Sequence, residues 1–293
     1  SELSNYILDL PKLRKLTDYS TYLAPILAKW SMPSLADYEG ELCPDFSATT
    51  LVSCTLNLWE GPKFDGLDGL LSFISNNPTL RSLSLIFHEF IPYMSRSQVD
   101  AKATLSSLET FSVHFAGGCY IDSNFERFMT NLNLPKITQL SLRLVSDPDY
   151  GAPEESDTGR LFRVLFPGLN PYPTLDKLDL ITDAFYVIPS KQLEELLDRL
   201  PSLRHLYVEA PQLNPSADGW TERGPPPLHS VELSNCDRLT RGFVEAFVNV
   251  LLRNDHSDDD RMKTFTVFNC RGIHYLAFSD LEAKLGDRFV FIL

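Results

Sequence analysis

The sequence predicts an α/β fold: a right-handed α/β solenoid with about ten irregular repeats, whose strands line up in one parallel, concave sheet. Three observations predict it. A short pattern of Pro, Leu and further apolar residues recurs along the chain. Its last two apolar positions lie two residues apart, which is the periodicity of a strand. Helix-like stretches separate many copies and end before a proline, which cannot continue a helix.

The recurring pattern is Pro-x-Leu-x-x-Leu-x-Leu with local variation. It reads NNPTLRSLSL at 76–85, YPTLDKLDL at 172–180 and RLPSLRHLYV at 199–208. Five of the nine steps between copies are 25 to 29 residues long, which leaves room for one strand and one helix in each of those repeats. The first apolar residues of the ten copies are Leu13, Leu35, Leu51, Leu80, Leu108, Ile137, Leu175, Leu203, Leu228 and Met262.

Helices are expected between the strands, and a cap is expected at the C-terminus. In the region 190–200, apolar residues fall at i, i+3, i+4 and i+7, and Ser190 is the expected N-cap. A short helix at 280–285 and a last strand at 288–293 predict a cap over 280–293. Residues 1–9 have the pattern of the tail of an upstream repeat helix. Because the repeats cover nearly the whole chain, 1–293 is expected to form a single solenoid. The five internal helices are expected at 67–76, 125–131, 159–166, 191–199 and 241–253.

Composition limits the classes of partner. The 293 residues carry a net charge of −13, which argues against general binding to nucleic acid or to anionic membranes. No uninterrupted apolar run is long enough to span a bilayer. The five cysteines are widely spaced and form no C-x-x-C, so neither a disulfide framework nor a zinc site is expected. A reducing compartment, cytoplasm or nucleus, fits this pattern.

These repeats resemble the leucine-rich-repeat family, of the ribonuclease-inhibitor-like type that forms a horseshoe. Their irregular lengths and the Pro-x-Leu-x-x-Leu-x-Leu signature look most like the repeat domains of fungal F-box proteins. The resemblance implies that the repeats bind a protein substrate for a Skp–cullin–F-box ubiquitin ligase. It also implies an F-box that docks the ligase adaptor. We find no F-box motif in the sequence and expect one upstream of residue 1.

Residues between the buried leucines are expected to point out of the concave face in three columns. The first column reads Ser53, Ser82, Thr110, Gln139, Lys177, His205, Ser230 and Thr264. The second reads Thr55, Ser84, Ser112, Ser141, Asp179, Tyr207, Glu232 and Thr266, and the third reads Asn57, Ile86, His114, Arg143, Ile181, Glu209, Ser234 and Phe268.

Partner-binding residues are predicted on this face and in two rim loops. An ordinary solvated sheet face is the alternative for the columns. The aromatic rim residues either anchor a partner or fold back over the core; these are Phe90, Tyr93, Tyr120, Tyr150, Phe185, Tyr186 and Trp220. The candidate site residues are His114, Arg143, Lys177, Asp179, His205, Tyr207, Glu209, Glu232, Tyr150 and Trp220.

No catalytic residue, cofactor or metal is predicted, because the glycine-rich and metal-ligating motifs of common enzymes are absent from the sequence. His114 and Cys119 could form a nucleophile pair and the acidic stretch 254–261 a metal site, but a post-strand loop and a solvated turn are the preferred interpretations. We expect a monomer that binds a protein or peptide and neither nucleic acid nor membrane. Two other functions stay open: a stand-alone scaffold or inhibitor, and a small-molecule receptor or enzyme that uses the aromatic rim.

Overall fold

The computed structural model describes residues 9–18, 30–41, 50–59, 66–90, 102–119, 121, 123–146, 155–215, 225–253, 262–273 and 278–292. These residues form a mixed α/β fold that divides into two compact units, Ser1–Ile137 and Thr138–Leu293. Within each unit, every strand pairing among the described residues is parallel, as the sequence predicts.

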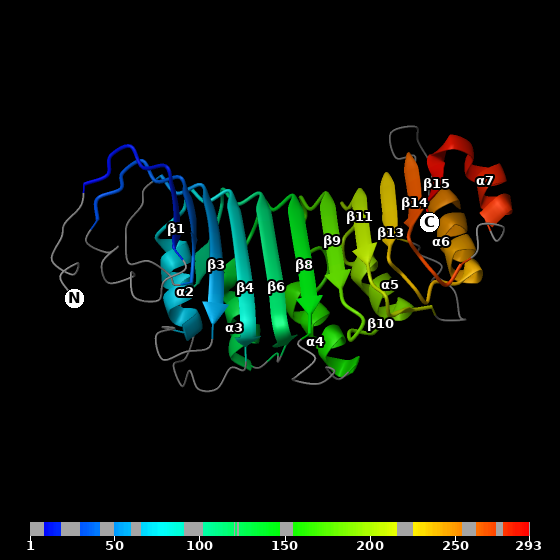
Figure 1. Ribbon diagram of the computed structural model, residues 1–293, viewed down its shortest axis with the longest axis horizontal. Helices are drawn as coiled ribbons and strands as arrows, with labels where there is room; N and C mark the ends of the chain where they lie inside the picture. The colour runs from blue at the N-terminus through cyan, green and yellow to red at the C-terminus, as the bar shows by residue number, and fades with distance from the viewer. Residues whose placement is uncertain are drawn as a thin grey trace. The chain divides into compact units, whose positions relative to one another are not determined.

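The first unit has five described strands in one parallel sheet, in the order β1-β2-β3-β4-β6. Helices α2 (Gly66–Ser75) and α3 (Ser123–Asn131) lie on the same face of these strands (Figure 1). A second, two-residue pairing joins β5 to β7. The strands are β1 Lys15–Asp18, β2 Asp37–Gly40, β3 Ser53–Trp59, β4 Ser82–Phe90, β5 Ala103–Thr104, β6 Thr110–Cys119 and β7 Leu132–Asn133.

The second unit repeats this arrangement with six described strands in the order β8-β9-β11-β13-β14-β15. A second short pairing joins β10 to β12. The strands are β8 Gln139–Val145, β9 Lys177–Thr182, β10 Ile188–Pro189, β11 His205–Glu209, β12 Leu213–Asn214, β13 Ser230–Ser234, β14 Thr264–Phe268 and β15 Phe289–Ile292. The helices are α4 Glu155–Leu165, α5 Ser190–Asp198, α6 Arg241–Arg253 and α7 Ser279–Leu285, followed by the 3-10 turn η4 Gly286–Arg288.

The same backbone arrangement precedes successive strands. Before β4, the amide of Leu80 donates to the carbonyl of Asn77, three residues back, which closes a turn. The next two amides, of Arg81 and Ser82, both donate to the carbonyl of Val52 near the start of the preceding strand. The same double donation joins 36 and 37 to Arg14, 52 and 53 to Ala36, 109 and 110 to Arg81, 176 and 177 to Thr138, 204 and 205 to Asp176, 229 and 230 to Arg204, and 263 and 264 to His229. Each first apolar residue of the sequence pattern lies two positions before the start of a described parallel strand.

The core of each unit lies between its sheet and its helices. In β9, Leu178 and Leu180 are fully buried and alternate with exposed or half-buried residues. In α5 the expected stripe, Leu193, Leu196, Leu197 and Leu200, is buried. In the first unit, the Phe125 ring of α3 meets those of Phe87 and Phe115 at 5.7 and 5.4 Å between ring centroids. Deleting such a side chain costs about 3–5 kcal/mol of folding stability.

The five internal helices are confirmed near their expected bounds, but the expected N-cap of α5 is wrong. Ser190 is the first helical residue, and the N-cap is Pro189, which has an extended backbone and no side-chain acceptor. The pattern Pro-Ser predicts the helix start correctly to within one residue. Proline takes the cap position because its fixed φ of −61° suits the entry into the helix.

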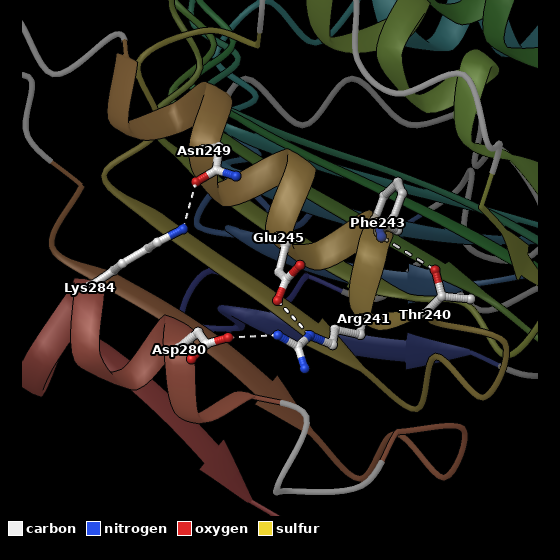
Figure 2. A network of polar contacts seen from close by, with 7 residues as sticks. All are labelled: Thr240, Arg241, Phe243, Glu245, Asn249, Asp280 and Lys284. Atoms are coloured by element: carbon white, nitrogen blue, oxygen red, sulfur yellow. Dashed lines mark hydrogen bonds and ion pairs between the residues drawn. The ribbon is translucent and has the colours of Figure 1, made fainter.

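The helix α7 and the strand β15 follow α6 in the second unit, where the sequence predicts a short helix and a last strand. Figure 2 shows the polar contacts between the two helices. Arg241 binds Glu245 on its own helix at 2.6 Å and Asp280 of α7 at 2.7 Å. Lys284 Nζ donates to Asn249 Oδ1 at 3.3 Å. In addition to these contacts, the buried Phe278 ring packs on Phe289 and Phe291 of β15.

Within the described ranges, no helix has both the length and the apolar character needed to cross a bilayer.

Candidate functional site

The three outward columns predicted from the sequence are in register within each unit. In the second unit, Asp179 pairs with Tyr207, Tyr207 with Glu232, and Glu232 with Thr266 along the middle column. The first and third columns align in the same way, and so do the three columns across β3, β4 and β6 of the first unit. We call this outward side of the strands the open face of each unit.

The open face of the first unit is rich in hydroxyl groups. Ser53, Ser82 and Thr110 form one row, and Thr55, Ser84 and Ser112 form the next, all half-buried. His114 belongs to the third row of this unit, beside Ile86. The other seven described candidates belong to Thr138–Leu293.

A chain of hydrogen bonds fixes the polar side chains around Tyr207 in the second unit. Tyr207 OH donates to Glu209 Oε2 at 2.9 Å, and Asn235 Nδ2 donates to Glu209 Oε1 at 2.8 Å. Asn269 Nδ2 in turn donates to Asn235 Oδ1 at 2.6 Å. Both asparagines have a positive φ, of 50° and 48°, a conformation that Asn tolerates better than most residues. Both oxygens of Glu209 are therefore occupied within the protein.

The environment of Tyr207 disfavours its ionised form. The pKa of Tyr207 is raised to about 12, first because burial penalises the phenolate. The carboxylates of Glu209 and Glu232 also raise it, whereas the hydrogen bond with Ser234 lowers it. Tyr207 thus acts as a hydrogen-bond donor throughout the neutral pH range.

The first column holds a second polar cluster. Lys177 Nζ lies 3.1 Å from Asp179 Oδ2, so these two candidates neutralise each other. His205 Nδ1 is 2.9 Å from Ser230 Oγ, and His205 Nε2 is 3.8 Å from Asp176 Oδ2. This order of groups is that of a serine nucleophile, a base and an acid, but 3.8 Å exceeds a hydrogen bond, so Asp176 does not orient the ring as an acid partner would. The cluster can bind polar groups, and its geometry does not support nucleophilic catalysis.

Two candidates have charges with no partner of their own. Neither Glu232 nor Arg143 makes a hydrogen bond or an ion pair within the described part of the chain, and both side chains are exposed. They lie on different strands, β13 and β8. These charges are available to an external group.

Sequence reasoning places Phe268 in the third outward column, but it misses Ile292, the apolar residue that lies beside Phe268 on the same face. Phe268 and Ile292 are 38% and 45% exposed and lie in register on β14 and β15. The signal was present: in RFVFIL, the residues 289 and 291 alternate with 290 and 292, and only one of these pairs can face the core. The prediction of a C-terminal cap does not say which residues of this strand face the core and which face outward.

The rim aromatics divide where the structure describes them. Phe185 is 42% exposed, whereas Tyr186 is buried, so Tyr186 seals the core and Phe185 is open to solvent. Tyr150 and Trp220 lie outside the described residues, and so do Tyr93, Tyr120 and the acidic stretch 254–261. The expected loop position of Cys119 is wrong, because β6 continues through it after a register shift opposite 88–90.

The described residues contain no group of three or more His, Cys, Asp or Glu side chains placed to hold a metal ion. In comparisons with known proteins, no family model matches this chain, and no curated protein matches it.

Proposed function

We propose that this chain is a non-catalytic recognition scaffold, a leucine-rich-repeat-like solenoid of about ten repeats whose open face binds a protein or peptide. One observation carries the proposal: polar side chains of successive parallel strands lie in register over a sheet face that no described helix covers (Figure 1). The repeated double hydrogen bond between neighbouring strand starts supports the solenoid.

The size of the face favours a macromolecular partner. Neighbouring strands lie about 4.8 Å apart, so five strands span about 19 Å and six span about 24 Å. Small-molecule sites are concave and bury most of their ligand, whereas these columns form a broad sheet surface. The side chains are anchored by hydrogen bonds to one another, as in the Tyr207, Glu209 and Asn235 chain, which lowers the entropy lost on binding.

In its finer form the proposal is that the repeats hold the substrate of a Skp–cullin–F-box ubiquitin ligase, in the cytoplasm or the nucleus. Its support is the resemblance of the Pro-x-Leu-x-x-Leu-x-Leu repeats to those of fungal F-box proteins. The test is co-purification of the full-length gene product with the ligase adaptor. Stable adaptor binding is expected, and its absence would reduce the function to that of a stand-alone scaffold or inhibitor.

Site-specific photo-crosslinking tests the binding face. A photoreactive phenylalanine replaces Ser84 or Thr266 on the open faces, or the exposed Arg127 of α3 or Glu195 of α5 as matched helix-side controls. Partners are expected to crosslink from at least one open-face position and from neither helix position. Crosslinks confined to the helix positions would refute the proposal.

A further inference from the structure

The open face of the second unit ends in an apolar surface beside an acid. Phe268 and Ile292 pair in register on β14 and β15, and the next outward pair toward the strand starts is Thr266 with Val290. Phe268 and Ile292 are exposed, and Thr266 and Val290 are half-buried. Together with Glu232 of β13, which is in register with Thr266, these four residues form what we call the C-terminal patch.

Of the three carboxylates in the described outward columns of the second unit, only that of Glu232 is open to a cation from outside. Asp179 is paired with Lys177, and both oxygens of Glu209 accept hydrogen bonds within the protein. Glu232 is exposed and has neither a hydrogen bond nor an ion pair among the described residues. Its charge also has no cation from the patch itself, which contains no Lys, Arg or His.

The distance between the acid and the apolar pair suits a single short segment. Ser234 is the strand partner of Phe268, and Glu232 lies two residues before Ser234 on the same strand. With a rise of about 3.3 Å per residue and strands about 4.8 Å apart, the Cα atoms of Glu232 and Phe268 lie about 8 Å apart. Two side chains that project from one face of a bound segment can reach both.

We propose that the C-terminal patch binds a protein segment that carries an Arg or Lys beside an aliphatic or aromatic side chain. The cation pairs with Glu232, and its apolar neighbour packs on Phe268 and Ile292. An arginine can also lie over the Phe268 ring. The net charge of −13 favours encounters with a basic partner. This inference rests on the proposed function and names the partner's chemistry.

A second copy of the chain fits the patch less well. A symmetric dimer places the same surface on both sides of the interface, so the unpaired acid of one copy would approach that of the other. No cation within the patch offsets this repulsion. The test therefore includes the oligomeric state.

Peptide selection tests the inference separately from the function. A phage library of random dodecapeptides is panned on the wild type and on Glu232→Lys, with Glu195→Lys on α5 as the matched charge control. We expect enriched peptides that pair Arg or Lys with Leu, Ile, Val, Met or Phe, that bind Glu195→Lys, and that are lost with Glu232→Lys. Two results would overturn the inference and leave the proposed function standing. In the first, the enriched peptides contain no basic residue. In the second, they bind Glu232→Lys as well as they bind the wild type but do not bind Tyr207→Ala. No peptide that depends on any open-face residue would refute both.

The affinity of an enriched synthetic peptide gives the second readout. Fluorescence anisotropy should show about fivefold weaker binding by Glu232→Gln, as expected for an exposed ion pair, and no change for Glu195→Gln. Phe268→Ser should weaken binding about tenfold or more, whereas the equally apolar loop change Leu169→Ser should not. Raising the salt from about 50 mM to about 500 mM should weaken binding by the wild type but much less by Glu232→Gln. Equal peptide affinities for Glu232→Gln and the wild type would overturn the inference. So would a wild-type protein that is a dimer in solution and that becomes a monomer with Phe268→Ser.

Discussion

Tyr207 and Glu209 project from the same face of one strand, and the Tyr207 hydroxyl donates a hydrogen bond of 2.9 Å to Glu209 Oε2. The two residues are two positions apart, so the strand itself places them side by side. Asn235, which directly follows the next strand, holds the other oxygen of Glu209. The centre of the open face is therefore a fixed array of donors and acceptors.

The raised pKa of Tyr207 predicts a loss of stability at alkaline pH. Between the ordinary value of 10.0 and the folded value of about 12, the unfolded tyrosine is ionised while the folded one keeps its proton. The unfolded state then binds fewer protons, so the free energy of unfolding falls as pH rises through this window. In Tyr207→Phe this part of the fall should disappear, as measured by urea denaturation at several pH values. A wild-type and a mutant curve of equal slope would contradict the assignment.

Substitutions on the two sides of one strand should differ in their effect on folding. Leu178→Ala removes a fully buried side chain of β9 and should lower the free energy of unfolding by about 2–5 kcal/mol. Leu178→Asp and Leu206→Asp should unfold the unit, because a buried carboxylate without a partner costs several kcal/mol. Tyr207→Ala should keep the wild-type circular dichroism spectrum and most of the stability. Similar destabilisation by Leu206→Asp and Tyr207→Ala would show that the face assignment is wrong.

Aromatic packing, more than the surface ion pair, should hold α7 in place. Phe278→Ala empties a fully buried position against Phe289 and Phe291 and should cost about 3–5 kcal/mol. Asp280→Asn breaks only the exposed contact with Arg241 and should leave the urea midpoint close to that of the wild type. Hydrogen exchange over 279–292 supplies a local readout, with faster exchange expected for Phe278→Ala alone. Faster exchange in Asp280→Asn would assign the main role to the ion pair.

Three cysteines should resist alkylation in the folded protein. Cys54, Cys236 and Cys270 are buried, and the Cys236 amide lies 3.3 Å from Cys270 Sγ. The hydrogen bond with Cys270 and burial raise the pKa of the Cys236 thiol, so little Cys236 thiolate forms at neutral pH. The same hydrogen bond lowers the pKa of the Cys270 thiol, so the protection of Cys270 comes from its burial. Iodoacetamide labelling with peptide mapping should leave these three unmodified, and labelling in urea should modify all of them. Native labelling of Cys236 would contradict its burial.

The sequence predicts much of the fold because its signals are local and repeated. The recurring pattern supplies both the period of two and the alignment of one strand with the next, and together they place Asp179, Tyr207 and Glu232 in one column. The contacts of a side chain depend on its torsion angles, and the sequence does not predict these. The spacing of residues does not distinguish a Tyr207 hydroxyl that donates to Glu209 from one that points to solvent. The exposed pair of Phe268 and Ile292 follows from the same period of two, but residue type alone favours the core for both side chains.

Disulfide trapping across β13 and β14 tests the register of the array most directly. Glu232 and Thr266 are strand partners, and neighbouring strands about 4.8 Å apart lie within the Cα range that a disulfide can bridge. Ser230 and Thr266 are offset by two residues, about 8 Å, which is beyond that range. Under mild oxidation, the double variant Glu232→Cys/Thr266→Cys should form the crosslink rapidly and Ser230→Cys/Thr266→Cys should not, as shown by mass spectrometry of non-reduced peptides. Preferential crosslinking of the offset pair, or of neither pair in a folded protein, would contradict the register on which the open face depends.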